Sequence, residues 1–176
     1  SLVENHLIPA LDKVGEDYDK GTAFLPQLLS AAQAAQAVFE VIRSSIAAKG
    51  GVPVKKGKLI VATVQGDIHD IGKNIVKTVL GNYGYEVLDL GRDVPPETIL
   101  RTVQEQGVHL VGLSALMTTT LPAMEKTIRL LHTMEEPPVI FVGGAVVTPE
   151  CAKQMNADYY AKDAHQSVEI TRKVMG

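Results

Sequence analysis

Hydrophobic and polar residues alternate along most of the chain in a way that predicts strands separated by helices. Short apolar runs rich in β-branched residues, such as Leu59–Val64, are typical of buried strands. Between these runs, apolar residues recur every three or four positions, as Ile75, Val76, Val79 and Leu80 do, which is typical of one buried helix face. The pattern predicts strands over 58–64, 85–89, 109–114, 138–142 and 158–160, and helices near 72–83, 95–106, 120–134, 149–155 and 165–175.

This regular alternation is typical of an α/β protein with a parallel sheet and right-handed crossovers. We expect the flavodoxin-like (Rossmann-like) five-stranded order 2-1-3-4-5, in which ligands bind near the loops after the first and third strands. Upstream of the sheet, two helical patterns occupy residues 1–50, and residues 51–57 have the glycine- and lysine-rich composition of a linker. We therefore expect a helical unit over 1–50, a linker over 51–57 and an α/β domain over 58–176.

Composition narrows the classes of protein to consider. The net charge of −3 comes from acidic and basic residues mixed along 176 positions, so no basic stripe indicates a nucleic-acid partner. No apolar stretch approaches the roughly 20 residues that span a bilayer, and no signal peptide is visible. The single cysteine, Cys151, excludes an internal disulfide and fits a reducing compartment. We expect a cytoplasmic protein without a membrane partner.

The loop after the first predicted strand carries the most informative polar residues. It is not a phosphate-binding P-loop, because five residues rather than four separate Gly66 from Gly72 and because Asn74 replaces the required hydroxyl residue. One ring nitrogen of His69 could instead bind a metal while Asp67, two residues away, accepts a hydrogen bond from the other nitrogen. From spacing alone, Asp67 could equally cap the helix and His69 could be an ordinary loop histidine.

Four stretches, in order along the chain, resemble one family. The motif Asp67-x-His69-x-x-Gly72, continued by Lys73-Asn74-Ile75-Val76, resembles the corrinoid-binding signature of cobalamin-dependent methionine synthase and of corrinoid proteins in methyltransferase systems. The other three stretches are Phe24-Leu25-Pro26-Gln27, Ser114-Ala115-Leu116-Met117-Thr118-Thr119-Thr120 and Gly143-Gly144-Ala145. The resemblance implies a helical cap, a cobalamin-binding α/β domain, and cobalamin (methylcobalamin or a related corrinoid, with its cobalt) as cofactor.

The resemblance also implies roles for the residues of the first loop. His69 would be the lower axial ligand of the cobalt in a base-off/His-on state, in which it replaces the cofactor's own dimethylbenzimidazole. Asp67, with Thr120 behind it, would tune how strongly His69 binds, and Gly72 would allow a close backbone approach. A threonine-rich loop that merely caps the next helix is the alternative for Thr120.

Six further positions are implied to contact the cofactor. Phe24 would cover the upper axial position, although an aromatic residue before a helix also commonly packs as a hydrophobic staple. For Gly143 and Gly144 the alternative is an ordinary tight turn, in which paired glycines are also common. The residues implied to surround the dimethylbenzimidazole tail are Ser114, Leu116, Thr118, Gly143 and Gly144.

The function implied by the resemblance is that of a carrier. The chain shows no convincing acid–base or nucleophilic centre of its own, which fits a protein whose cofactor performs the difficult step. It would carry a methyl group on cobalt between a methyl-donor and a methyl-acceptor methyltransferase, with a reductive activase as a further partner. The alternatives are a cobalamin-sensing regulatory protein and an adenosylcobalamin-dependent mutase domain, whose family lacks the Lys73–Val76 continuation.

The helical unit is shorter than the cap of the resembled family. The cap of the resembled family has four helices, whereas residues 1–50 accommodate only two. We therefore expect an incomplete four-helix bundle, and we expect a second copy of the chain to complete it in a homo-oligomer, most simply a dimer.

Overall fold

A five-stranded parallel sheet forms the centre of the structure, and its strands follow the order β2-β1-β3-β4-β5. The computed structural model describes residues 3–48 and 56–176, so most of the expected linker lies outside the described residues. The order confirms the flavodoxin-like prediction, and each strand begins and ends within two residues of its predicted bounds. The strands are β1 (Lys58–Thr63), β2 (Glu86–Asp89), β3 (Leu110–Ser114), β4 (Val139–Gly143) and β5 (Tyr159–Tyr160).

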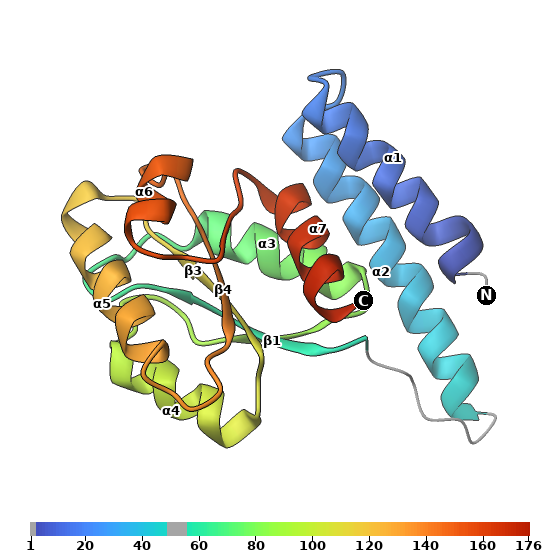
Figure 1. The fold of residues 1–176 in the computed structure, drawn as a ribbon. Coiled ribbons are helices and arrows are strands. Elements are labelled where there is room, and N and C mark those ends of the chain that lie inside the picture. The colour runs from blue at the N-terminus through green and yellow to red at the C-terminus, as the bar shows by residue number, and fades with distance from the viewer. Residues whose placement is uncertain (1–2, 49–55) are drawn as a thin grey trace.

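Helices cover both faces of the sheet, so the sheet divides the hydrophobic core into two clusters (Figure 1). One hydrophobic cluster packs the sheet against α4 (Pro96–Gln106), α5 (Leu121–Leu131) and the short α6 (Pro149–Gln154). The other packs the opposite face against α3 (Ile71–Asn82) and α7 (Ala164–Met175). In β1, Ile60 and Ala62 belong to the first cluster, and Leu59 and Val61 to the second, because successive side chains point to opposite faces.

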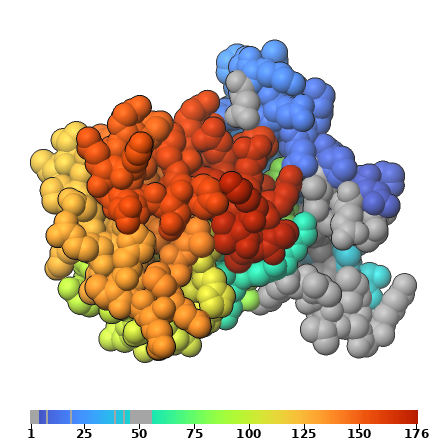
Figure 2. All heavy atoms as spheres, in the orientation of Figure 1, coloured from blue at the N-terminus to red at the C-terminus, as the bar shows by residue number. Residues whose placement is uncertain are grey.

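The N-terminal residues form a helical hairpin that packs against α3 and lies beside α7 (Figure 1). Figure 2 shows the hairpin next to the C-terminal helix α7. A π-helical turn, Val3–Leu7, leads into α1 (Ile8–Asp19), and α2 (Leu25–Ala48) runs back antiparallel to it. Pro9 and Pro26 each lie in a first helical turn, where the missing backbone N–H costs nothing. None of the helices over 3–48 and 56–176 combines the length and apolarity needed to cross a bilayer.

Small and polar residues join the hairpin to the α/β unit. Gly15 lies so close to the ring of His165 that a Cβ at that position would be 2.3 Å from it, so α1 reaches α7 only because position 15 is glycine. Asp12 accepts hydrogen bonds from the Tyr83 hydroxyl at 3.1 Å and from the Arg172 guanidinium at 2.8 Å. Burial and the Asp12 charge together raise the pKa of Tyr83, so its hydroxyl stays a donor.

One exposed row along α2 is apolar, and no other part of the described chain covers it. Ala34, Ala37, Val38 and Val41 follow helical spacing, and all four side chains are exposed, Val41 to 71%. We call these four residues the outer row of α2.

Candidate functional site

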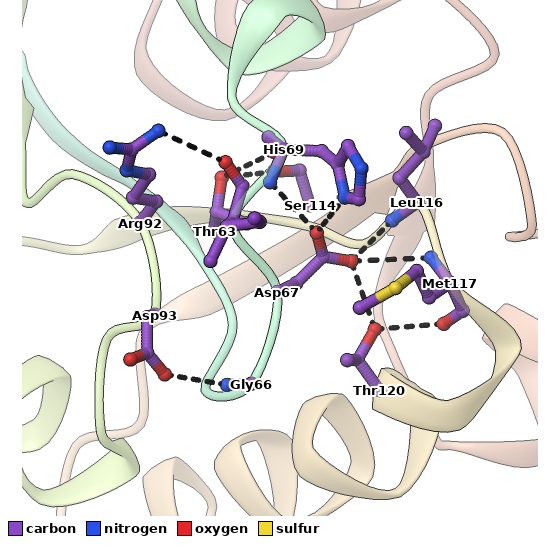
Figure 3. Close-up of polar contacts among 11 residues, drawn as sticks. Thr63, Gly66, Asp67, His69, Arg92, Asp93, Ser114, Leu116, Met117 and Thr120 are labelled. Carbon is purple, nitrogen blue, oxygen red and sulfur yellow. Dashed lines mark hydrogen bonds and ion pairs between the residues drawn. The ribbon is translucent and has the colours of Figure 1, made fainter.

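Asp67 is a fully buried carboxylate in the loop after β1, and it accepts five hydrogen bonds from two loops (Figure 3). Its Oδ1 accepts from the backbone N–H of His69 at 3.0 Å and from ring atom Nδ1 of His69 at 2.8 Å. Its Oδ2 accepts from the backbone N–H groups of Leu116 at 2.7 Å and Met117 at 3.2 Å. The Thr120 hydroxyl donates to the same oxygen at 3.0 Å. The carboxylate therefore joins the loop after β1 to the loop after β3.

The hydrogen bonds to Asp67 determine which nitrogen of His69 carries the proton. Burial opposes ionisation of the carboxyl, but the hydrogen bonds from His69, Leu116 and Thr120 outweigh it and hold the pKa of Asp67 well below its usual range. An ionised carboxylate can only accept, so Nδ1 of His69 must be the donor. Nε2 has no partner among the described residues, and the side chain is 44% exposed. The loop thus presents an imidazole that is anchored through Nδ1 and directs its other nitrogen, Nε2, outward, an arrangement suited to binding a metal.

His69 lines a cavity of about 870 Å³ whose other lining residues come from the sheet, from helices α3 and α7 and from the hairpin. The hairpin contributes one wall through Tyr18, Leu25 and Leu28. Deeper lining residues come from the sheet (Val61, Gly112, Phe141), from α3 (Ile75, Val76) and from α7 (Ala164, Ser167).

Exposed apolar side chains surround the imidazole. Ile68 is 60% exposed, Ile71 is 77% exposed and Leu116 is 42% exposed, and all three line the same cavity as His69. Large apolar side chains exposed together in this way mark a surface that a ligand or partner covers. The cavity therefore combines an apolar rim, a polar ligand atom and a slot that reaches into the α/β core.

The glycine pair after β4 meets a demand of the fold as well as lining the cavity. Gly144 has φ +123°, and a Cβ there would lie 2.0 Å from the carbonyl oxygen of Ala115. A Cβ at Gly143 would lie 2.8 Å from the carbonyl oxygen of Ala161. Both glycines therefore allow neighbouring loops to approach, and both line the cavity.

The structure brings most of the expected residues together. His69, Gly72, Ser114 and Leu116 line the cavity with the glycine pair, while Asp67 and Thr120 lie behind the imidazole. Asp67 does not cap α3, because Asp70 occupies the N-cap position. Thr120 occupies the N-cap of α5, but its side chain makes no capping hydrogen bond and bonds Asp67 instead.

Two expected residues lie apart from this group. Phe24 is 69% exposed and is not among the cavity-lining residues, so it neither packs as a staple nor faces the imidazole. The following residue, Leu25, lines the cavity in its place. Thr118 is exposed in a 3₁₀ turn and also lies outside the lining.

Sequence reasoning missed three residues that hold the site. The backbone N–H of Met117 is one, because main-chain donors carry no signature in a sequence. Thr63 is buried at the end of β1, and its hydroxyl donates to the carbonyl oxygen of His69 at 3.2 Å. The Ser114 hydroxyl lies 2.9 Å from the Thr63 hydroxyl. Because Thr63 uses its one hydroxyl hydrogen to bond the carbonyl oxygen of His69, Ser114 donates to Thr63. The third missed residue is Asp93, after β2, whose carboxylate accepts a hydrogen bond from the backbone N–H of Gly66 in the loop of His69.

Comparisons with known proteins identify the family. The B12 binding domain family matches residues 57–169, and a second family with the same description matches residues 1–43. Dimethylamine corrinoid protein 1 of Methanosarcina mazei is 38% identical over 177 residues, which cover 99% of this chain and 81% of that protein. A corrinoid protein of Desulfitobacterium hafniense is 34% identical over 99% of this chain and 82% of its own length.

Solved structures agree with the sequence matches. A cobalamin-binding protein from Desulfitobacterium hafniense superimposes with a TM-score of 0.83 at 33% identity, over 94% of this chain and 78% of that one. A chain of the methanol:cobalamin methyltransferase complex of Methanosarcina barkeri superimposes with a TM-score of 0.80 at 33% identity, over 99% of this chain and 66% of that one. With the α/β fold and the loop described above, these matches show that the chain belongs to the family of B12-binding corrinoid proteins.

Proposed function

We propose that the chain binds cobalamin with His69 beneath the cobalt and carries a methyl group between a methyl-donor and a methyl-acceptor methyltransferase. The observation that carries the proposal is the His69 imidazole, held through Nδ1 by the buried Asp67 carboxylate, beside a cavity of about 870 Å³. Cobalamin would supply the cobalt on which the methyl group is carried.

The residues present fit a metal that brings most of its own ligands. No group of three or more His, Cys, Asp or Glu side chains able to hold a bare ion occurs among the described residues. A single imidazole suits a metal already enclosed by a macrocycle. The exposed Ile68, Ile71 and Leu116 would lie against the apolar parts of such a ring, and the slot between the sheet and α7 would accept its nucleotide arm.

The role of the protein itself is to keep a proton on Nδ1 of His69. Asp67 holds the proton of His69 on Nδ1, so Nε2 stays free to donate its lone pair. Thr120 and the backbone N–H groups of Leu116 and Met117 hold the carboxylate in turn. Loss of such a supporting partner typically costs about 10–100-fold in metal affinity or activity.

The partners are proposed from the relatives. One superimposed chain comes from a methanol:cobalamin methyltransferase complex, and several relatives are named dimethylamine corrinoid proteins. We propose donor and acceptor methyltransferases of this general kind, and a reductive activase that restores the oxidised cofactor.

We also propose that a second copy of the chain covers the outer row of α2. Its exposed apolar side chains would complete a four-helix bundle across a two-fold axis. Analytical ultracentrifugation should show a dimer for the chain and a monomer for Val41→Glu. A monomeric, well-ordered wild-type chain would refute this part of the proposal.

Electron paramagnetic resonance of the divalent-cobalt form tests the axial ligand. Histidine labelled with ¹⁵N should change the nitrogen splitting of the cobalt signal, and His69→Ala should abolish that splitting. The exposed His109 provides a matched control, because His109→Ala removes a histidine outside the cavity and should leave the splitting intact. A cobalt signal insensitive to the histidine label would refute His69 as the ligand.

A further inference from the structure

Asp93 adopts a backbone conformation that few residues other than glycine adopt. It lies in the loop between β2 and α4, is exposed, and has φ 54°. Aspartate tolerates this left-handed region better than most residues, but it still carries a conformational cost there. Such strained positions cluster at functional sites, where surrounding contacts maintain them.

Two hydrogen bonds join Asp93 to the loop that carries His69. Its Oδ1 accepts from the backbone N–H of Gly66 at 2.7 Å, as Figure 3 shows, and its own backbone N–H donates to the carbonyl oxygen of Asp67 at 2.9 Å. The side chain and the main chain of one residue therefore hold both Gly66 and Asp67.

The other main-chain groups of this loop are held partly from the β1 segment and partly by Arg92, whose guanidinium donates to the carbonyl oxygen of Ile68 at 3.4 Å. The N–H of Asp67 donates to the carbonyl oxygen of Val64 at 3.1 Å, and the Thr63 hydroxyl donates to the carbonyl oxygen of His69. Both of these partners belong to the β1 segment. The neighbouring β2 loop therefore anchors this segment through both Arg92 and Asp93, and Asp93 is the residue of the two that bonds the main chain of Gly66 and Asp67.

We infer that Asp93 is a positioning residue for His69 and that it acts through the backbone of Asp67. This inference rests on the proposed function. The two hydrogen bonds made by Asp93 fix the position of the Asp67 main chain. The Oδ1 atom of Asp67 must stay within about 3.2 Å of Nδ1 of His69 to keep the hydrogen bond between them. Glycine would adopt this left-handed φ at a lower conformational cost than aspartate. The hydrogen bond from the Gly66 N–H to the Asp93 carboxylate offsets that cost.

Paired substitutions separate positioning from mere turn formation. Asp93→Gly removes the carboxylate but accepts the left-handed φ, while Asp93→Asn keeps an acceptor oxygen and tolerates the same φ. In the cobalamin-free chain, Asp93→Gly should speed hydrogen exchange of the Gly66 amide by roughly 10- to 100-fold, because a charge-assisted bond is lost. Asp93→Asn should restore exchange to within a few-fold of wild type.

The cobalamin-loaded protein gives the decisive readout. Asp93→Gly should reduce the fraction of divalent cobalt that shows histidine nitrogen splitting, and cobalamin affinity should fall about 10-fold. Asp93→Asn should recover both. Asp158 provides the matched control, because its carboxylate accepts from the Ile140 N–H at 2.8 Å far along the chain from this loop. Asp158→Ala should lower stability without changing the histidine splitting.

The inference is overturned if Asp93→Gly retains the wild-type splitting and affinity, or if Asp158→Ala reduces the splitting equally. Asp93→Ala, which also removes the carboxylate, serves as a second variant if the glycine variant does not fold. A wild-type protein without histidine splitting would instead refute the proposed function, so the two failures are distinguishable.

Discussion

Replacing Asp67 with asparagine should move a proton from one nitrogen of His69 to the other. The Oδ2 side of the carboxylate faces three donors, from Leu116, Met117 and Thr120, so the amide oxygen of the variant should take that side. The NH₂ group then faces Nδ1 of His69, which must become an acceptor. The ring proton moves to Nε2, and the atom available for a metal is lost.

The size of the effect on stability follows from the hydrogen bonds that change. On the Oδ1 side, the backbone N–H of His69 at 3.0 Å would meet another donor and lose its bond to a charged acceptor. A hydrogen bond to a charged group contributes about 1.5–3 kcal/mol, and an unsatisfied buried donor costs about 1–3 kcal/mol. Because Asp67 is fully buried, both contributions apply, and we expect Asp67→Asn to lower the free energy of unfolding by about 2.5–6 kcal/mol.

Two measurements test this prediction. Ring ¹⁵N shifts in the cobalamin-free chain should report the Nδ1–H form of His69 in wild type and the Nε2–H form in Asp67→Asn. Urea unfolding at pH 7 should give the difference in stability. The control, Thr120→Val, removes one donor to Oδ2 and leaves the Oδ1 side intact, so it should cost about 1 kcal/mol without a change of tautomer. An Asp67→Asn protein that keeps the Nδ1–H form would refute the reasoning.

Three further predictions concern the surrounding structure. Gly144→Ala should destabilise the chain by about 3 kcal/mol in thermal or urea unfolding, because the new Cβ would meet the Ala115 carbonyl at 2.0 Å and φ is positive; a loss below about 1 kcal/mol would contradict this. Asp12→Asn should cost about 1 kcal/mol, since the pair with Arg172 is partly exposed, and should speed hydrogen exchange in α1 but not in the strands. The pKa of Asp67 is depressed by folding, so its contribution to stability is present above its unfolded pKa of about 3.9 and is lost as the pH falls. Unfolding measured from pH 5 to pH 2 should therefore show wild type losing its advantage over Asp67→Asn, and a constant difference would contradict this.

The order of strands and helices could be predicted from the spacing of apolar residues, because that spacing is regular along the whole α/β part of the sequence. The run over 58–64 is buried on both faces and corresponds to β1, and the alternation of strands and helices left few topologies possible. The loop motif placed Asp67 and His69 at the switch point for the same reason. The contact of Asp67 with Thr120, 53 residues later, followed from resemblance, since spacing alone does not specify which loops meet.

Other parts of the site depended on geometry that no local pattern contains. Phe24 and Leu25 are adjacent apolar residues, and the rotation of α2 decides that Leu25 lines the cavity. The role of Asp93 depends on β2 lying beside β1 and on a left-handed φ at a residue that is not glycine.

The Asp67 carboxylate holds both sides of the crevice at once. One of its oxygens accepts hydrogen bonds within the loop after β1 and the other accepts them from the loop after β3, and both loops line the cavity. A guest that wedges these loops apart would stretch the bond to the imidazole, and one that leaves them in place would preserve it. Through this one residue, the spacing of the two loops and the orientation of the His69 ring are therefore coupled.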